Sequence, residues 1–237
     1  MNKNMKYSNR VRANEFDQWV GRLQTIKAME LGRGTSILDI GCGVGQFTPM
    51  FLKRFTRVVG LDASETFVES ARKGNNGIEY ILGWGDRFSL DEKFDTISMN
   101  MLLEHVDDPV ALLKNCKRHL ARKGRILAQV PNANSVTRRI GVLMGIIDSI
   151  SNISDKERNF FGHKRTYTLS SLVADCEKAG LNVVEKGGLL FKPLPNEALG
   201  KICKTHGKIW TDNFMAALVK FGEDRPEDCA NLYVACE

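Results

Sequence analysis

A strand-length apolar run that ends in three alternating glycines is the feature that most constrains this chain. Residues 37–40 read Ile-Leu-Asp-Ile, and Gly41, Gly43 and Gly45 follow before a helical pattern begins near Gln46. Glycine accepts positive φ and lets a ligand lie against the main chain, and a helix N-terminus presents free N–H groups. We therefore expect a strand, a tight turn and a helix that face a ligand. The spacing is Gly-x-Gly-x-Gly rather than the Gly-x-Gly-x-x-Gly of dinucleotide-binding folds, so the turn alone does not identify that ligand.

Strand-like and helical patterns alternate along the rest of the chain. We expect strands at residues 37–40, 58–61, 78–82, 94–99, 124–130, 181–185 and 231–235. We expect helices at residues 13–31, 46–55, 109–121, 136–150, 169–179 and 196–221, and one more that begins near Ser64. This alternation predicts βαβ units and a parallel sheet, hence an α/β fold.

The alternation of strands and helices is interrupted at residues 132–167, a segment too long for a simple connection between a strand and a helix. This insertion follows the fifth strand on the ligand side of the sheet, and it could be a lid, core or a dimer surface. Because every helix has a strand to pack on, we expect residues 1–237 to form one domain, with the N-terminal helix at about residues 13–31. Whether residues 1–13 close over the pocket, with Tyr7 as a candidate, is left open.

The composition is typical of a globular cytoplasmic protein. Of 237 residues, 43% are hydrophobic and 26% are charged, which is typical of a soluble globular protein. Six cysteines occur without a Cys-x-x-Cys pair, so reduced thiols are expected. No apolar run is long enough to span a bilayer. The formal charge of +6 is small for a nucleic-acid-binding protein, which makes nucleic acid an unlikely partner and leaves a small anionic ligand open.

Three carboxylates accompany the first three strands. Asp39 lies inside the first strand, Asp62 ends the second, and Asp86 follows the third. Because the carboxyl ends of parallel strands meet at one edge, the two later carboxylates can face one ligand. A carboxylate at Asp62 can accept hydrogen bonds from both ribose hydroxyls, and one at Asp86 can accept from the amine of adenine. The set predicts a nucleoside pocket, and Asp39 could hold the glycine turn or, through water, a ligand ammonium group.

These motifs together resemble those of the class I S-adenosylmethionine-dependent methyltransferases. The match runs through residues 37–45, 59–62, 85–86, 94–97, 102–109 and 124–132. The resemblance implies a Rossmann-like, seven-stranded, mostly parallel sheet with a reversed last strand and helices on both faces. It implies S-adenosyl-L-methionine as cofactor and S-adenosyl-L-homocysteine as product. The cofactor-binding residues it implies are Asp39, Gly41, Gly43, Gly45, Asp62, Ala63, Asp86, Arg87 and Asn100.

Two of the four histidines are candidates for the general base. His105 follows the fourth strand, and His163 precedes the helix that begins near Leu169. A hydroxyl acceptor must lose its proton near the transition state, and a neutral imidazole suits that task. We predict His163 or His105 as the base, supported by Tyr167; an amine acceptor would need positioning alone. The remaining histidines, His119 and His206, have basic neighbours and are predicted to lie on the surface.

Glu104, His105 and His163 also raise the question of a metal. In small-RNA 2′-O-methyltransferases, a Glu-x-x-Glu-His run and a later histidine bind a divalent cation. Met101 stands here at the position of the first glutamate. One oxygen ligand is therefore missing, whereas hard cations need several. We predict no metal.

Polar and basic residues on the ligand side are candidates for binding the methyl acceptor. They are Asn132, Arg138, Arg139, Arg165 and Lys192. Arginine forks suit phosphate. We therefore predict methyl transfer to a hydroxyl or amine of a small anionic acceptor, such as a nucleotide-linked sugar or a phosphorylated intermediate of carbohydrate or cell-surface biosynthesis. The alternatives are an RNA 2′-O-methyltransferase and a non-catalytic cofactor-binding regulatory protein. The apolar insertion would also allow a homodimer.

Overall fold

A seven-stranded sheet forms the centre of the computed structural model, which describes residues 15–74 and 77–237. The strand order is β3-β2-β1-β4-β5-β7-β6, and every pair is parallel except the two that involve β7. The strands are β1 (Ser36–Ile40), β2 (Arg57–Asp62), β3 (Glu79–Leu82), β4 (Phe94–Asn100), β5 (Leu120–Pro131), β6 (Val183–Phe191) and β7 (Cys229–Cys236). The predicted Rossmann-like sheet with its reversed last strand is confirmed. Residues 1–13, and with them Tyr7, lie outside the described residues.

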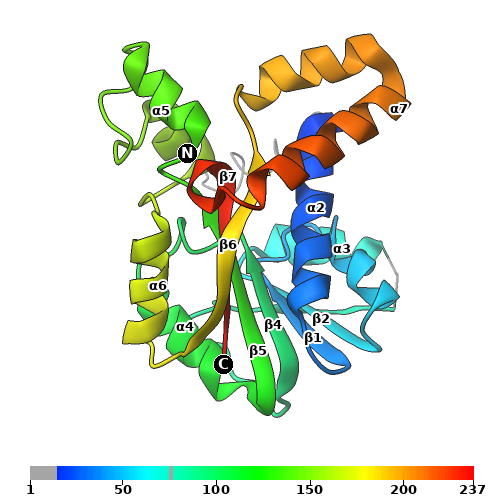
Figure 1. Cartoon of the computed structure of the whole chain (residues 1–237). Coiled ribbons are helices and arrows are strands. Elements are labelled where there is room, and N and C mark those ends of the chain that lie inside the picture. Colours follow the sequence, from blue (N-terminus) through cyan, green and yellow to red (C-terminus); the bar gives the residue numbers. More distant parts are fainter. Residues whose placement is uncertain (1–14, 75–76) are drawn as a thin grey trace.

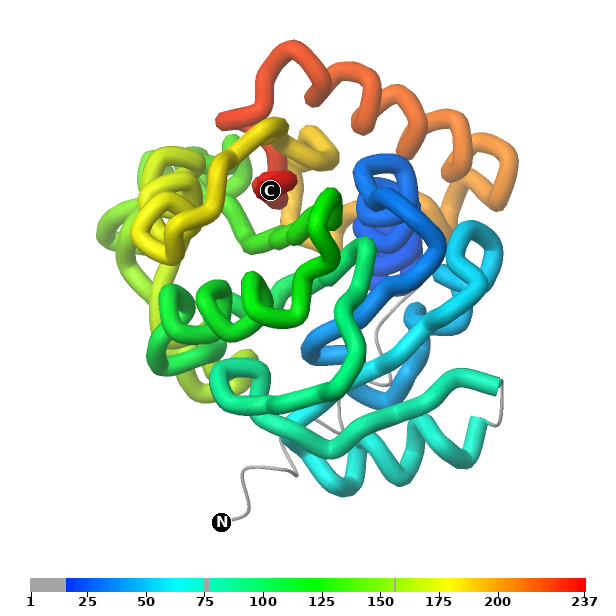
Figure 2. The backbone as a smooth tube through the Cα atoms, turned by 90° about the horizontal axis from the view of Figure 1, so that it is seen from below, coloured from blue at the N-terminus to red at the C-terminus, as the bar shows by residue number. Residues whose placement is uncertain are grey.

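Helices cover both faces of this sheet (Figures 1 and 2). They are α2 (Glu15–Leu31), α3 (Glu65–Lys73), α4 (Pro109–Arg118), α5 (Val136–Leu143), α6 (Leu169–Lys178) and α7 (Asn196–Gly222), with short turns η2 (Thr48–Lys53), η3 (Lys156–Phe161) and η4 (Pro226–Asp228). The larger core joins α4 and α6 to the sheet through Leu112, Cys116 and Leu172. A second cluster joins α2 and η2 to the opposite face through Ala28 and Phe51.

Two helix starts follow the chemistry that their sequences predict. Asp108 caps α4, because its carboxylate accepts a hydrogen bond of 2.9 Å from the main-chain N–H of Ala111, and Pro109 occupies the first turn. Thr168 caps α6 in a capping box with Ser171. These caps hold the two helices that cover one face of the sheet, and α6 follows the insertion directly.

Several element boundaries differ from the prediction, and glycine explains two of the differences. The helix predicted at residues 136–150 stops at Leu143, because Gly145 adopts a φ of +68°. The long helix α7 is broken at Gly207, with a φ of +77°. The helix predicted at residues 46–55 is the short 3₁₀ turn η2, and the π-helical turn η3 was not predicted. No helix in the described part of the chain is long and apolar enough to cross a membrane.

Candidate functional site

The three glycines after β1 have positive φ, but they face different surroundings. A Cβ atom at Gly41 would lie 3.1 Å from Leu102, and one at Gly45 would lie 2.7 Å from the hydroxyl of Tyr80. A Cβ atom at Gly43 would meet nothing within 4 Å. Gly41 and Gly45 therefore allow close packing inside the protein. Gly43, whose φ is +57°, exposes its main chain to open space at the carboxyl end of the sheet.

Asp62 joins the glycine turn to the end of β2. One carboxylate oxygen accepts a 2.9 Å hydrogen bond from the N–H of Gly43, and the other accepts one of 2.9 Å from Ser64. Burial raises the pKa of Asp62, although these main-chain N–H groups oppose the shift. Each carboxylate oxygen has more than one acceptor direction. The carboxylate is thus held in place and can still accept hydrogen bonds from a pair of hydroxyls.

Asp39 is buried inside β1 beneath the turn. The hydroxyl of Thr48, in η2, donates a 2.7 Å hydrogen bond to its carboxylate. Burial raises the pKa of Asp39 to about 7, against the effect of that hydrogen bond. The negative charge of Asp62 raises it further. Asp39 is therefore a carboxyl group whose ionisation would respond to a nearby cation.

The loop after β3 brings Asp86 toward the same end of the sheet. A Cβ atom at Gly85 would lie 3.3 Å from Ile40, the last residue of β1. Asn115, in α4, donates hydrogen bonds to the carbonyls of Gly85 and Phe88, at 3.2 and 3.0 Å. The side chain of Arg87 contacts Asp86 at 3.2 Å. The loop therefore crosses over the end of β1, where its carboxylate can face a ligand on the glycine turn.

His119 belongs to the support of this loop, and its predicted surface position is wrong. The ring is buried, Nε2 accepts a 3.2 Å hydrogen bond from the N–H of Leu90, and Nδ1 lies 3.0 Å from the carbonyl of Asn115. It also packs on Phe88, with ring centroids 4.3 Å apart. Neither Asn115 nor His119 was predicted to support the site. The remaining histidine, His206, is exposed as predicted.

The end of β4 is pinned to β5 through Asn100. Its side-chain oxygen accepts a 2.8 Å hydrogen bond from Gln129, which also donates to the carbonyl of Gln24 in α2. The next residue, Met101, has a φ of +54°, a backbone conformation that residues other than glycine rarely adopt. Such strain is often found at functional sites. Here it turns the chain from β4 into the loop that carries the first candidate base.

That loop carries Glu104 and His105, and both lie in one cluster with His163, which follows η3. One potential ligand atom from each of the three lies within 4.8 Å of the others. The rings of His105 and His163 are in edge-to-face contact at 4.9 Å, and Nε2 of His105 lies 3.6 Å from the Glu104 carboxylate, which is only 1% exposed. Nδ1 of His105 lies 3.3 Å from the carbonyl of Gly162. The cluster could hold a proton or a cation, and the absence of a metal stays a prediction.

Arg165 connects the segment that carries His163 to the loop that carries Glu104 and His105. Its guanidinium donates to the carbonyls of Leu103 and Asp107, at 2.8 and 2.9 Å, and to that of Val106. The neighbouring Lys164 adds a 2.8 Å main-chain hydrogen bond to the carbonyl of Glu104 and an ion pair with Asp107. Residues 162–165 are thereby fastened to the loop after β4. Sequence reasoning predicted an acceptor-binding role for Arg165, whereas its contacts are with the loop.

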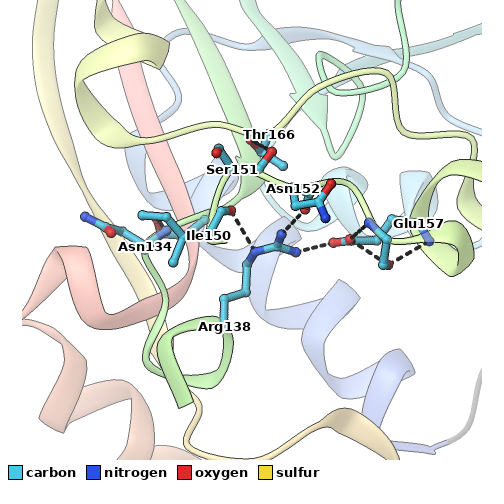
Figure 3. Close-up of polar contacts among 9 residues, drawn as sticks. Asn134, Arg138, Ile150, Ser151, Asn152, Glu157 and Thr166 are labelled. Carbon is cyan, nitrogen blue, oxygen red and sulfur yellow. Dashed lines mark hydrogen bonds and ion pairs between the residues drawn. The ribbon is translucent and has the colours of Figure 1, made fainter. Parts of the chain in front are cut away.

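Arg138 is also bonded within the protein. Its guanidinium donates to the carbonyls of Ile150 and Asn152 and pairs with the carboxylate of Glu157 (Figure 3). Arg139 pairs with Asp228 beside η4. These contacts tie the insertion to itself and to the segment before β7. The carbonyl of Glu157 also accepts a 2.9 Å hydrogen bond from the main-chain N–H of His163, so Arg138 is linked to the histidine cluster through Glu157.

The other three predicted residues are likewise held by protein groups. Asn132 is buried and donates to the carbonyls of Glu227 and Cys229, both at 2.8 Å. The hydroxyl of Tyr167 donates to Asp175 at 3.1 Å, and burial raises the pKa of this tyrosine. Lys192 donates to Asn196 at 2.6 Å, and burial lowers its pKa to about 8. The structure therefore brings His105 and His163 together and gives these three side chains bonds elsewhere.

The glycine turn and its carboxylates fit the cofactor that the sequence resemblance implies. Gly43 leaves room for a ligand against the main chain. Asp62 presents a fixed carboxylate for ribose hydroxyls, and Asp39 presents a titratable carboxyl for an ammonium group. All of them lie near the point between β1 and β4 where the strand order reverses, which is the usual ligand site of such sheets.

Known proteins with similar sequences and folds are methyltransferases. A family model described as a methyltransferase domain matches residues 10–186. A ubiquinone biosynthesis O-methyltransferase from Dinoroseobacter shibae is 30% identical over 170 residues, covering 70% of this chain and 67% of that protein. One from Idiomarina loihiensis is 27% identical, covering 71% of this chain and 70% of that protein.

Solved structures support the fold alone, because their sequence identity is low. A methyltransferase from Thermotoga maritima has a TM-score of 0.62 at 22% identity, with 98% of each chain covered. One from Mesorhizobium loti has a TM-score of 0.60 at 19% identity, with 89% of this chain and 94% of that chain covered. The family match spans most of the chain, and the motifs, the sheet order and the glycine turn agree with it. This protein therefore belongs to the class I S-adenosylmethionine-dependent methyltransferases.

Proposed function

We propose that this methyltransferase transfers its methyl group to a hydroxyl of a small, largely uncharged acceptor, such as an aromatic ring with neighbouring hydroxyls. The observation that carries the proposal is the cluster of His105, His163 and buried Glu104, which follows β4 next to the glycine turn. A proton acceptor at this position is what a hydroxyl substrate needs and what an amine can do without. The similar proteins named for ubiquinone biosynthesis are O-methyltransferases, which supports the same class of acceptor.

The cofactor would be held by the residues at the carboxyl ends of β1 to β4. The main chain at Gly43, the carboxylate of Asp62 with the adjoining Ala63, and the side chain of Asp86 beside Arg87 would hold the nucleoside. Asp39 and the end of β4 at Asn100 would face the amino-acid part. When bound, the cofactor supplies an activated methyl group on a sulfonium, so the protein mainly positions the acceptor and excludes water.

The surroundings of the two histidines favour His163 as the base. Both ring nitrogens of His105 face oxygen atoms, those of Gly162 and Glu104. A neutral imidazole has one N–H, so His105 satisfies both oxygens only when it is protonated or shares a proton with Glu104. His163 lies against the edge of that pair. It would take the acceptor's proton, and the buried negative charge of Glu104 would stabilise the resulting imidazolium.

The contacts of the basic residues argue for an uncharged acceptor over the anionic one expected from the sequence. Arg138 and Arg139 pair with carboxylates, Arg165 donates to three carbonyls, and half-buried Lys192 donates to Asn196. Binding a phosphate through Arg138 or Arg165 would compete with these bonds within the protein, whereas the pair made by Arg139 is exposed and leaves that side chain available. The proposal therefore moves from nucleotide-linked sugars and phosphorylated intermediates to neutral hydroxylated rings.

Methyl incorporation from labelled cofactor tests the proposal directly. The acceptors are a dihydroxylated aromatic ring, the same ring with an amine in place of the hydroxyls, a nucleotide-linked sugar and RNA. We expect label in the dihydroxylated ring, with the product identified as an aryl methyl ether by mass spectrometry. Label only in the amine, the sugar or the RNA would overturn the acceptor class. No label in any of them, with the cofactor bound, would favour a non-catalytic role.

A further inference from the structure

The two halves of α7 meet in a protruding corner that leaves large apolar side chains in water. Gly207 breaks the helix, and every residue from Lys204 to Trp210 is exposed. Ile209 is 81% exposed, and Trp210 is 38% exposed. Trp210 is held in place by ring contacts with His206 and Phe214, at 4.3 and 4.7 Å. We refer to residues 204–210 as the α7 corner; they lie beyond the region that the family model matches.

A second exposed apolar corner follows α5. Leu143 is 87% exposed, Met144 is 67% exposed and Ile146 is 68% exposed, and the chain turns between them at Gly145. We refer to residues 143–146 as the α5 corner. Scattered exposed apolar residues need no explanation, whereas groups of them indicate a contact surface.

Both corners stand at the same end of the molecule. In Figure 1, α5 and α7 rise on opposite sides above the carboxyl ends of the parallel strands, and Figure 2 shows the two elements well separated around the sheet. The end of the sheet with the glycine turn and the histidine cluster lies between them. Two separate convex corners suit a deformable surface better than a flat protein interface, which needs a continuous patch.

The charged residues around the α7 corner favour an anionic surface. Lys201, Lys204 and Lys208 are exposed, and no acidic residue occurs between Lys201 and Thr211. Glu197 and Asp212 flank the corner and pair with Lys201 and Lys208. Exposed pairs of this kind contribute little and leave the lysines available. Lysine, tryptophan and isoleucine side by side are the combination found where helices lie in the headgroup region of a bilayer.

We propose that the α7 and α5 corners dock this protein on a membrane surface that contains anionic lipid. The lysines of α7 contact headgroups, while Ile209, Trp210 and the apolar side chains of the α5 corner enter the boundary with the acyl chains. The end of the sheet that carries the site then faces the membrane, so an acceptor dissolved in the bilayer can reach it. This inference concerns the surface and stands whether or not the proposed hydroxyl acceptor is correct.

Sedimentation with vesicles tests the docking. The full chain is mixed with vesicles of phosphatidylcholine alone, or of phosphatidylcholine with phosphatidylglycerol, at low and high salt. We expect binding only when phosphatidylglycerol is present, weakened by salt. The double variant Lys204→Glu/Ile209→Asp should bind about tenfold more weakly or worse. Leu143→Ser/Ile146→Ser should also weaken binding, with little change in its salt dependence.

Matched variants at the other end of the sheet serve as controls. Arg122→Glu/Lys123→Glu makes a similar change of charge at the exposed start of β5, and Val184→Ser removes an exposed apolar side chain from β6. Both should bind vesicles like the unchanged protein. Cofactor binding and the circular dichroism spectrum show that each variant is folded.

Three results would overturn the proposal. One is no sedimentation with phosphatidylglycerol vesicles. Another is equal loss of binding in the control variants and in the corner variants. The third is a dimer, measured by light scattering, that dissociates when Ile209 is changed to Asp, because that would make the corner an interface between copies of this chain.

Discussion

Asp39 shows how burial moves the titration of a carboxyl group close to neutral pH. Its pKa in the folded chain is raised to about 7, from 3.8. The unliganded protein therefore loses stability at this residue as the pH rises from about 4 through 7, because the folded state keeps a proton that the unfolded state gives up. A ligand ammonium group reverses the preference, since it favours the carboxylate.

We therefore predict that cofactor affinity rises with pH between about 5 and 7 and that Asp39→Asn removes most of this rise. An α-amino group ordinarily titrates at about 7.7 to 8.0, and its loss of charge would weaken binding, so the cofactor's own amino group does not produce the rise. Isothermal titration calorimetry across this range, in two buffers of different ionisation enthalpy, also detects the proton that binding releases. An unchanged pH dependence in the Asn variant would separate Asp39 from the ligand.

Substitution of Arg165 tests whether turnover requires the loop after β4 to be held in place. Replacing it by Gln leaves the carbonyls of Leu103, Val106 and Asp107 without their donor. We predict that turnover at saturating cofactor falls about tenfold to a hundredfold, because the histidine cluster shifts, while cofactor affinity changes less than about twofold. Arg165→Lys should recover part of the turnover.

The control for Arg165 is Arg139→Gln, which removes a guanidinium that pairs with Asp228 away from the cluster. It should keep its turnover. If Arg165→Gln loses cofactor affinity in proportion to turnover, or if Arg139→Gln behaves identically, the positioning role is refuted. Steady-state kinetics and a thermal melt of each variant separate the two effects.

For single residues, the sequence predicts which side chains belong to the site better than it predicts their hydrogen-bond and ion-pair partners. The glycines and carboxylates are identifiable because parallel strands bring their carboxyl ends together. The partners of Arg138, Arg165 and Lys192 depend on how residues far apart in the chain fold back, and no local spacing encodes that. His119 was assigned to the surface from its basic neighbours, whereas its ring is buried by Phe88.

One ion pair with its hydrogen bonds joins two parts of the insertion at residues 132–167. Glu157 accepts from Arg138 and from the hydroxyl and N–H of Ser154. Burial opposes ionisation of this carboxyl, and the hydrogen bonds from Ser154 with the charge of Arg138 lower its pKa overall. The stabilisation that the carboxylate supplies is therefore present at neutral pH and is lost as the pH falls through the lowered pKa.

We predict that Glu157→Gln loosens the insertion without unfolding the sheet. The expected loss is about 1 kcal/mol, which is roughly a fivefold rise in local opening, because the pair is only partly buried. Hydrogen exchange should accelerate at residues 150–161 and stay unchanged in β1 and β4. Asp148→Asn, at an exposed contact with Asn152, is the control. Faster exchange throughout the chain would contradict a local role.

Helix and strand types follow from the sequence more securely than their ends. Residues 136–150 carry an apolar pattern that continues past Leu143, yet Gly145 adopts a left-handed conformation and ends the helix. The break in α7 depends on Gly207 in the same way. A glycine inside a helical pattern permits such a break, but whether it occurs depends on packing with the rest of the protein.

At the scale of the whole molecule, the best-predicted property is the kind of sheet, which has seven strands, mostly parallel, with the last one reversed. Alternating strands and helices specify a parallel sheet, and the resemblance of the motifs supplied the reversed seventh strand. The acceptor side was the least predictable part. We propose that it is formed by the insertion and the loop after β4, whose mutual contacts join residues far apart in the sequence.

The central claim is that a methyl group is transferred next to a histidine cluster in which His163 takes the acceptor's proton. The most direct measurement is the single-turnover rate of methyl transfer to a dihydroxylated aromatic ring as a function of pH, for the unchanged protein and for His163→Asn. We predict that the unchanged protein loses its rate below the pKa of one group, and that the variant binds the cofactor normally but reacts at least about a hundredfold more slowly, without that pH dependence. A variant that keeps both the rate and the pH profile would contradict the account.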